Sequence, residues 1–299
     1  MKVVISGASG LIGRYLSSKY IESGHAVIAL TRSAKNIPLI NGLTDVVEYD
    51  YQTNILPKSI NNADLVINLT GKNIVTRWTK SNKQIIYSSR VESTKYLVEA
   101  LSKLSTPPKM LASASAIGYY GDTQDQIITE QTSNGSGYFS NLCIDWENAA
   151  LKAESYHIKT TILRTGIVLS KNGGAFTRML IPFKLGLGSK FGSGKQIWSW
   201  VHIEDVFRAL EYLRVNNING PVNIVAPGSI SQSDFGRQLA YTVHMPFLFR
   251  IPQVLLKIAL GEMSAELLSS KTVSPEKLTN HGFTFLYPDI EKALSALLQ

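Results

Sequence analysis

Short apolar stretches recur along the first half of the chain, and longer stretches with apolar residues at helical spacing separate them. The short stretches are rich in β-branched residues and apolar along their whole length, which is typical of parallel strands covered on both faces. They lie at 3–6, 26–30, 45–49, 65–69, 110–113 and 160–163. The longer stretches predict helices at about 9–23, 81–104 and 139–155. This alternation predicts an α/β fold with a doubly wound parallel sheet, a Rossmann fold.

The pattern changes beyond residue 170, where glycine-rich loops alternate with short apolar helical segments. Near the end, Ser274-Pro275-Glu276 and Pro288-Asp289 are typical helix starts, because proline suits the first helical position. We therefore expect a cofactor-binding Rossmann domain at 1–170 and a smaller C-terminal substrate lobe at 171–299. Residues 203–226 are expected to return to the Rossmann sheet.

The turn after the first strand has the spacing G-x-x-G-x-x-G. Residues without a Cβ let backbone N–H groups approach a diphosphate, and the following helix offers its positive end to the anion. The position between a strand and a helix strengthens this interpretation. The residues expected to bind the dinucleotide here are Gly7, Ser9, Gly10, Leu11, Ile12 and Gly13.

The end of the second strand indicates which dinucleotide binds. A carboxylate at this position usually binds the ribose hydroxyls of NAD, whereas an arginine accommodates the extra phosphate of NADP. The chain has Thr31-Arg32-Ser33 there and no carboxylate. The guanidinium of Arg32 suits a phosphate, and the hydroxyl of Thr31 can add a hydrogen bond. The sequence therefore predicts NADP.

The composition indicates a globular protein without a membrane span or an internal disulfide. The 299 residues are 44% hydrophobic and 17% charged, which is typical of a globular protein. No apolar run is long enough for a membrane span, and the N-terminus lacks a signal-peptide pattern, so we expect a cytoplasmic protein. The one cysteine, Cys143, excludes an internal disulfide and any thiol cluster, so we expect no metal site.

The formal charge of +8 suits either nucleic acid or a small anionic ligand. The lysines and arginines are spaced out, and residues 155–203 contain no acidic residue. This distribution favours a basic cleft for a phosphate-bearing small molecule over a nucleic-acid surface. We expect an anionic small-molecule substrate, with neither nucleic acid nor membrane as a partner.

Several motifs together give the chain a resemblance to a known group of proteins. They are Gly7–Gly13, Asn68–Ile74, Arg77–Thr79, Ser89–Val91, Ser113–Gly121, Asp145–Glu147, Leu163–Gly166, Trp200–Asp205, Leu260–Met263 and Gly282–Phe283. In these segments the chain resembles an extended short-chain dehydrogenase/reductase, within the NAD(P)-dependent epimerase/dehydratase-like group of epimerase family proteins that carry a small C-terminal domain.

The resemblance implies further site residues. It implies that Asn68, Leu69, Thr70 and Gly71 approach the cofactor at the end of the fourth strand, and that Arg90 reaches it from the following helix. It also makes a homodimer plausible, paired through helices that include the one from Phe139, with a monomer as the alternative.

The catalytic residues of the superfamily are only partly present. Ser115 matches the serine that binds the substrate carbonyl or hydroxyl. Aligning Asp145-Trp146-Glu147 with the end of the motif helix puts Phe139 and Cys143 where the superfamily has tyrosine and lysine. A shift of one residue recovers Tyr138 but puts Leu142 at the lysine position. A tyrosine without a neighbouring cation is a poor base at neutral pH, so the usual relay is absent.

Other residues are candidates for the missing proton donor. We expect Tyr120 or Tyr138 to act with Ser115, and Tyr119, Glu130 and His202 are further candidates. His202 is better explained as a hydrogen-bonding residue at a helix start, and Cys143 as a small core residue.

Two functions remain open at this point. The first is an NADP-dependent oxidoreductase or epimerase for an anionic carbonyl or nucleotide-linked sugar, with a non-standard proton relay. The second is an NADP-binding protein with little or no catalysis, which acts through a protein partner.

Overall fold

The computed structural model describes residues 1–36, 40–51, 54–124 and 126–298. A seven-stranded sheet forms its centre, in the order β12-β7-β5-β4-β1-β2-β3, with every neighbouring pair parallel. The strands are β1 Lys2–Ser6, β2 Ala26–Thr31, β3 Asp45–Glu48, β4 Leu65–Asn68, β5 Met110–Ala116, β7 Lys159–Thr165 and β12 Gly220–Ile224. The predicted doubly wound α/β class is confirmed.

The strand order reverses between β1 and β4, where the chain crosses from one half of the sheet to the other. Ligands of such sheets bind outside the carboxyl ends of the strands at this point. The turn that follows β1 therefore stands where a dinucleotide site is expected.

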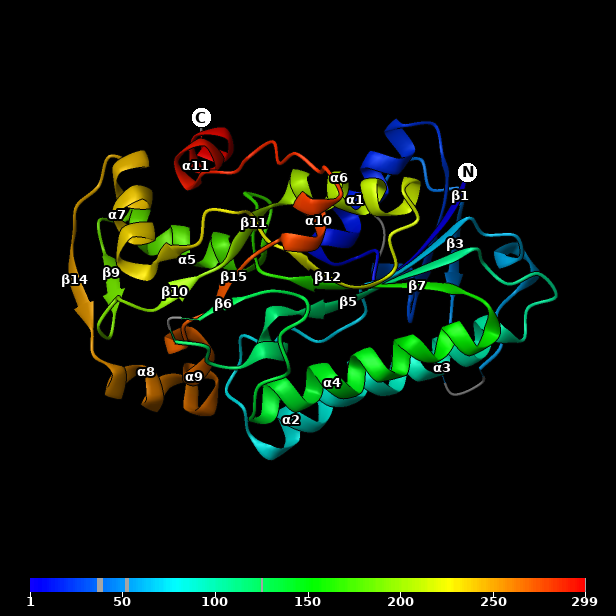
Figure 1. Ribbon diagram of the computed structural model, residues 1–299, viewed down its shortest axis with the longest axis horizontal. Coiled ribbons are helices and arrows are strands. Elements are labelled where there is room, and N and C mark those ends of the chain that lie inside the picture. The colour runs from blue at the N-terminus through cyan, green and yellow to red at the C-terminus, as the bar shows by residue number, and fades with distance from the viewer. Residues whose placement is uncertain (37–39, 52–53, 125, 299) are drawn as a thin grey trace.

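Helices cover both faces of the sheet (Figure 1). On one face α1 and α6 pack together, with Leu16 and Tyr20 of α1 buried beside Leu210 of α6. On the other face α3 buries Leu97 and Leu101 against the sheet. The helices of the chain are α1 Leu11–Glu22, α2 Lys80–Tyr87, α3 Ser93–Ser102, α4 Tyr138–Leu151, α5 Gly174–Lys184, α6 Ile203–Val215, α7 Gln232–Thr242, α8 Gln253–Leu260, α9 Ser264–Leu268, α10 Glu276–Asn280 and α11 Ile290–Leu298.

A smaller lobe packs beside the carboxyl ends of the strands and has its own core. Trp198 and Phe235 are buried there with Phe176 of α5 and Leu294 of α11. The residues 203–226 contribute α6 and β12 to the Rossmann domain. Short paired strands complete the chain: β6 Ile127–Ile128 with β15 Thr272–Val273, β8 Ile167–Leu169 with β11 Trp200–His202, β9 Gly188–Phe191 with β14 Phe247–Ile251, and β10 Ile197–Trp198 with β13 Ile230–Ser231.

The segment predicted as one helix over 81–104 is interrupted. It consists of α2, a π-helical turn at Ser88–Glu92 and α3. A π-helical turn inside a helix is rare and frequently marks a functional site. Across the described part of the chain, no helix is both long and apolar enough to cross a membrane.

Candidate functional site

A cavity of about 680 Å³ lies at the carboxyl ends of β1, β2 and β4. Its wall is built by the glycine turn after β1, the turn after β2, the segment after β4 and the π-helical turn. The lining residues are Gly7, Ser9, Gly10, Leu30, Thr31, Arg32, Asp50, Tyr51, Leu69, Thr70, Gly71, Lys72, Asn73, Ile85, Ser88, Ser89, Glu92, Ser93 and Tyr96. Its volume lies within the usual range for small-molecule and cofactor sites.

Two glycines of the turn have different roles. Gly7 has a φ of +84°, and a Cβ there would lie 2.8 Å from the carbonyl carbon of Leu69. Gly13 lies inside α1, where a Cβ would lie 2.3 Å from the carbonyl oxygen of Gly7. Gly7 therefore lets two cofactor-facing segments approach each other, whereas Gly13 lets the helix pack against the turn. Both roles agree with the spacing of a dinucleotide-binding turn.

The cavity collects most of the predicted cofactor residues. It is lined by Gly7, Ser9, Gly10, Thr31, Arg32, Leu69, Thr70 and Gly71. Gly13 acts through packing, and Leu11 lines a neighbouring cavity instead. Asn68 is buried and donates hydrogen bonds to Thr94 and Ser113, so it holds the end of β4 in place behind the cavity. Ile12 is half-buried and packs against the sheet core.

The sequence analysis missed the residues that the turn after β3 and the π-helical turn bring to the cavity. Tyr51 is one of them, and its hydroxyl lies 3.2 Å from that of Thr70 and 3.3 Å from that of Ser6. Asp50 is another. It follows β3, the strand that pairs with β2, and Arg32 follows β2, so both residues line the same cavity. No local signal marked these residues, because their position depends on the pairing of β2 with β3.

Arg32 lies exposed at the end of β2, as the sequence analysis expects. The hydroxyl of Thr31 accepts a hydrogen bond from the backbone N–H of Ser33 and donates one to its carbonyl. The turn is further fixed by Glu48, whose carboxylate accepts a hydrogen bond of 2.7 Å from the N–H of Ala34. These contacts leave the guanidinium of Arg32 at the rim of the cavity.

Arg90 is half-buried beside the cavity. A Cβ on Gly71 would lie 2.9 Å from its Cζ, and its guanidinium lies 5.3 Å from the ring centre of Trp146. Burial lowers the pKa of Arg90 to about 10, so it remains a cation at neutral pH. Among the described residues no carboxylate forms an ion pair with it. A half-buried cation without a carboxylate partner is suited to an anionic ligand.

Ser115 lies at the end of β5 and is buried in a polar network. Its hydroxyl donates a hydrogen bond of 2.6 Å to Glu147 of α4. Arg164 of β7 binds the same carboxylate through two nitrogens, at 2.9 Å and 2.7 Å. Because the proton of Ser115 points to Glu147, the hydroxyl oxygen can accept a hydrogen bond from a ligand but cannot donate one in this arrangement.

Tyr120 belongs to the same network. Its hydroxyl donates to Asn223 at 2.8 Å and accepts a hydrogen bond from Arg164 at 2.9 Å. Burial raises its pKa to about 12, although the Arg164 guanidinium opposes this shift. The structure thus brings Ser115 and Tyr120 to one cluster through Arg164, but both ends of the Tyr120 hydroxyl are occupied. This geometry favours a structural role for Tyr120.

Phe139 and Cys143 of α4 stand where the superfamily has tyrosine and lysine, and both are buried. The ring of Phe139 packs directly on Gly118, because a Cβ on Gly118 would lie 2.1 Å from a carbon of that ring. Cys143 is fully buried, which confirms its interpretation as a core residue, and burial raises its pKa to about 12. Tyr138 is half-buried, donates a hydrogen bond of 2.8 Å to the carbonyl of Lys83, and has its pKa raised by burial.

The remaining candidates have structural partners. The imidazole of His202 accepts a hydrogen bond from the N–H of Glu204 at the start of α6, which confirms its interpretation as a helix-start residue. Burial lowers its pKa. The carboxylate of Glu130 accepts hydrogen bonds from the N–H groups of Asn223 and Lys277. Among the described residues no group of three His, Cys, Asp or Glu side chains could hold a metal ion.

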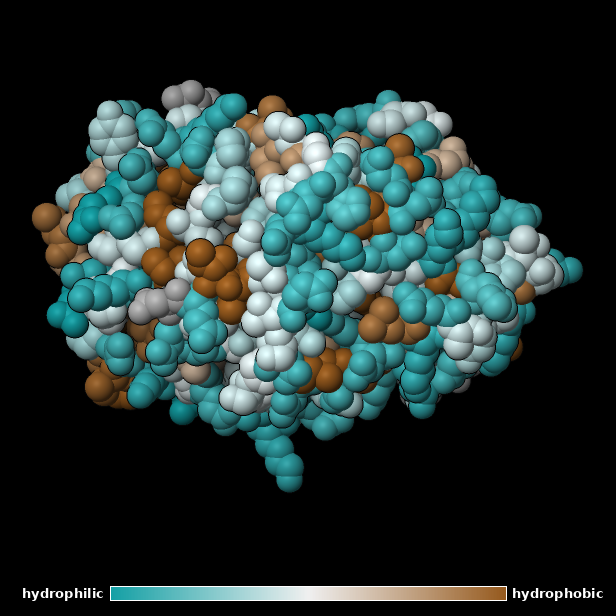
Figure 2. All heavy atoms as spheres, in the orientation of Figure 1, coloured by the Kyte–Doolittle hydropathy of each residue, from teal (hydrophilic) through white to brown (hydrophobic). Residues whose placement is uncertain are grey.

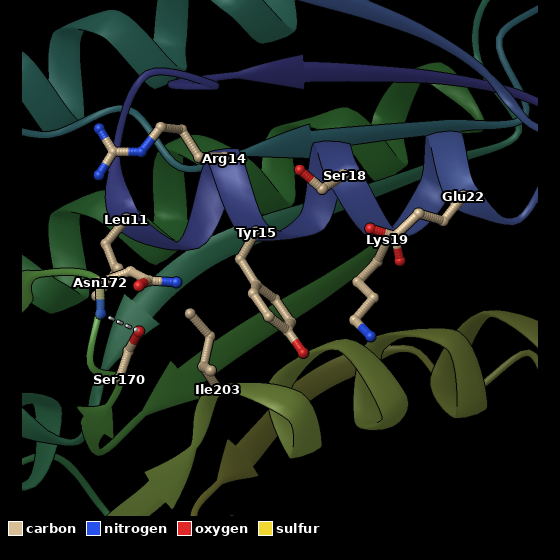
Figure 3. A pocket seen from close by; sticks show the side chains of 9 residues that line it. All are labelled: Leu11, Arg14, Tyr15, Ser18, Lys19, Glu22, Ser170, Asn172 and Ile203. Carbon is tan, nitrogen blue, oxygen red and sulfur yellow. Dashed lines mark hydrogen bonds between the residues drawn. The ribbon is translucent and has the colours of Figure 1, made fainter. Parts of the chain in front are cut away.

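A second cavity of about 340 Å³ lies between α1, the start of α6 and the segment after β8 (Figure 3). Tyr15 points from α1 toward Ile203, and Leu11 stands at the end nearest the glycine turn. The hydroxyl of Tyr15 donates to Glu204, which also pairs with Lys19 at 3.3 Å. These contacts join α1 to α6.

The fold and the cavity together define a dinucleotide-binding protein of the short-chain dehydrogenase/reductase type. The chain belongs to the NAD dependent epimerase/dehydratase family, which its residues 3–225 match. Residues 251–297 match a domain of unknown function, DUF1731, so the small C-terminal domain that the resemblance implies is also present.

Similar proteins agree with this assignment. An epimerase family protein of Mycobacterium bovis is 35% identical over 98% of this chain and 96% of its own. The crystal structure of human epimerase family protein SDR39U1 (isoform 2) with NADPH covers 100% of this chain and 99% of its own, with 28% identity and a TM-score of 0.88. A nucleoside-diphosphate sugar epimerase of Corynebacterium glutamicum is 31% identical with a TM-score of 0.77, and this chain covers 58% of it.

Proposed function

We propose that the protein is an NADP-dependent oxidoreductase or epimerase that acts on an anionic carbonyl compound or a nucleotide-linked sugar. The observation that carries the proposal is Arg32 at the rim of a cavity whose floor is the glycine turn. A guanidinium at the end of β2 suits the 2′-phosphate of NADP. The human protein crystallised with NADPH supports the choice of cofactor, and the sugar epimerase supports the class of substrate.

Ser115 is the proposed substrate-binding residue. Its hydrogen bond to Glu147 makes its oxygen an acceptor, so we propose that it binds a substrate hydroxyl and not a carbonyl oxygen. Tyr138 is the proposed proton donor, because it is only half-buried, whereas the hydroxyl of Tyr120 is buried between two partners. The Tyr138 hydroxyl donates to the carbonyl of Lys83 in this structure, so it must exchange that hydrogen bond for one to the substrate. Burial raises its pKa, so it holds its proton at neutral pH and can donate it but cannot act as a base in that state.

The test is hydride transfer. In one arm the protein is loaded with NADPH carrying deuterium at nicotinamide C4 and offered keto derivatives of nucleoside-diphosphate sugars. In the other arm it is loaded with NADP⁺, which can accept a hydride, and offered the sugars themselves. Products of both arms are analysed by mass spectrometry and NMR. We expect label in a reduced product, or an epimer formed without net cofactor consumption. Ser115→Ala should abolish this turnover, whereas Ser155→Ala, on the exposed surface, should leave it unchanged. Unchanged turnover in Ser115→Ala would remove Ser115 from the mechanism.

A second function is an NADP-binding protein with little or no catalysis that acts through a protein partner. Phe139 and Cys143, buried at the positions of the usual tyrosine and lysine, favour it. NADPH binding without label transfer to any of these compounds would support this second function over the first.

A further inference from the structure

Exposed hydrophobic side chains gather on the small lobe. Of the sixteen large hydrophobic residues that are exposed among the described ones, ten lie in residues 181–187 and 241–258. These ten are Ile181, Leu185, Leu187, Tyr241, Met245, Leu248, Phe249, Val254, Leu255 and Ile258. Single exposed hydrophobic residues are ordinary, but a concentration of this kind marks an interaction surface.

The two segments form one continuous surface, which we call the lobe tip. The end of α5 leads into β9, and β14 pairs with β9 in parallel. A Cβ on Gly186 would lie 3.9 Å from Pro246 and 4.0 Å from the sulfur of Met245. The helix α8 follows β14 directly, at the same end of the molecule (Figure 1). Hydrophobic spheres stand out at this left edge, beside β14 and over the start of α8 (Figure 2).

The lobe tip is also basic. Residues 171–203 and 235–261 contain no aspartate or glutamate. Their cations are Lys171, Arg178, Lys184, Lys190, Lys195, Arg237, Arg250 and Lys257. The acidic residues next to α8 are paired, since Glu262 binds Lys83 and Glu266 binds Lys271. Arg237 is paired with Asp234, but among the described residues no ion pair joins Lys184, Arg250 or Lys257 to a carboxylate, so an anionic partner would meet their positive charge between the exposed hydrophobic residues.

We propose that the lobe tip binds the surface of an anionic lipid bilayer. The helix α8 turns Val254, Leu255 and Ile258 outward and buries only Leu256, so its apolar side faces solvent. Such a helix can lie in the plane of a membrane interface with its apolar residues among the acyl chains. Lys257 and the neighbouring Arg250 can reach the headgroup phosphates while their stems stay in the apolar zone.

Charge argues against a second copy of the chain as the occupant. A two-fold contact would bring Lys184, Arg250 and Lys257 of both copies together, and like charges destabilise an interface. The shape of the lobe tip favours a bilayer over a peptide ligand. Leu248 of β14 is 79% exposed and Ile258 of α8 is 65% exposed, and both elements lie at one end of the molecule (Figure 1). Side chains that project in this way can enter a bilayer, whereas a peptide ligand needs a groove.

The proposal differs from the sequence-based expectation that no membrane takes part. Hydropathy along the chain detects spanning segments, whereas the lobe tip combines short segments that only the tertiary structure places together. The proposal is independent of the proposed function, because the lobe tip shares no residue with the lining of the cofactor cavity.

The test is co-sedimentation of the protein with vesicles of phosphatidylcholine alone and with vesicles that also contain phosphatidylglycerol. We expect binding to the anionic vesicles that weakens as salt is added. Lys184→Glu combined with Lys257→Glu should lower the partition coefficient by at least about five-fold per residue. Leu248→Ser combined with Ile258→Ser should lower it at least about ten-fold.

Matched control variants lie on other surfaces. Val215→Ser, 62% exposed on α6, and Lys103→Glu, exposed after α3, should bind vesicles like the unchanged protein. All variants should keep their melting temperature and NADPH affinity. Equal binding to neutral and anionic vesicles, or no binding to either, would overturn the proposal. A change of sedimentation velocity on Leu248→Ser with Ile258→Ser, without vesicle binding by the unchanged protein, would assign the lobe tip to self-association and would also overturn it.

Discussion

Gly71 and Arg90 are in direct contact although they lie on different elements. The segment after β4 passes so close to the π-helical turn that a Cβ on Gly71 would stand 2.9 Å from the guanidinium carbon of Arg90. The glycine therefore leaves the space that the guanidinium of Arg90 occupies next to a lining residue of the cofactor cavity.

Gly71→Ala should displace Arg90 and weaken NADPH binding about ten-fold, which corresponds to about 1.4 kcal/mol. Arg90→Met should weaken it by at least as much, because the cation itself is lost. Isothermal titration calorimetry measures both. In the double variant the two losses should not add, since both act through the same guanidinium. Full additivity would contradict the role of Gly71 as a spacer.

Arg32 should decide the preference between the two dinucleotides. Arg32→Ala should weaken NADPH binding at least about ten-fold and leave NADH binding nearly unchanged, because only NADPH carries a phosphate for the guanidinium. The dissociation constants come from nicotinamide fluorescence titrations. Lys35→Ala, exposed in the same turn, serves as the control for a general loss of positive charge. Equal losses for both cofactors would count against a phosphate-binding role for Arg32.

The ion pair between Arg164 and Glu147 should be essential for stability. Both side chains are 4% exposed, so Arg164→Met leaves a buried carboxylate without its cation. We expect a loss of about 3–5 kcal/mol in the free energy of unfolding. Arg237→Met is the control, because its pair with Asp234 is exposed and should contribute less than about 1 kcal/mol. Urea unfolding followed by circular dichroism gives both values, and similar losses in the two variants would refute the prediction.

Cys143 should make the folded state less stable in alkali. Burial raises its pKa from 9.0 to about 12. Below pH 9 the thiol is protonated in both states and the stability is fully present. Between pH 9 and 12 the unfolded chain loses this proton while the folded chain keeps it, so stability falls by up to about 1.4 kcal/mol per pH unit.

Urea midpoints at several pH values measure this slope. Other buried groups such as Tyr20, whose pKa burial also raises, add to the alkaline loss in every variant. The comparison is therefore with Cys143→Ala, which should lose stability less steeply above pH 9. Identical slopes would show that the thiol does not titrate in this way.

The sequence alone predicted the parts of the fold and site that depend on neighbours in the chain. The β1 turn carries its glycines within seven residues, and Arg32 directly follows its strand, so their positions at the cavity followed from the strand pattern. Chain periodicity also gave the class of fold, since alternating strands and helices leave few other ways to bury both faces of a sheet.

Other features of the site depend on contacts between distant parts of the chain, so only the tertiary structure shows them. The contact of Gly71 with Arg90 of the π-helical turn, the approach of Asp50 and Tyr51 to the cavity, and the direction of the Ser115 proton depend on segments that are separated in the sequence. Ser115 and Glu147 are 32 residues apart, and no local sequence pattern predicts which group accepts the hydrogen bond of the serine hydroxyl. The sequence determines which polar groups are present. The packing of the folded chain determines which of them form hydrogen bonds inside the protein and which remain free to bind a ligand.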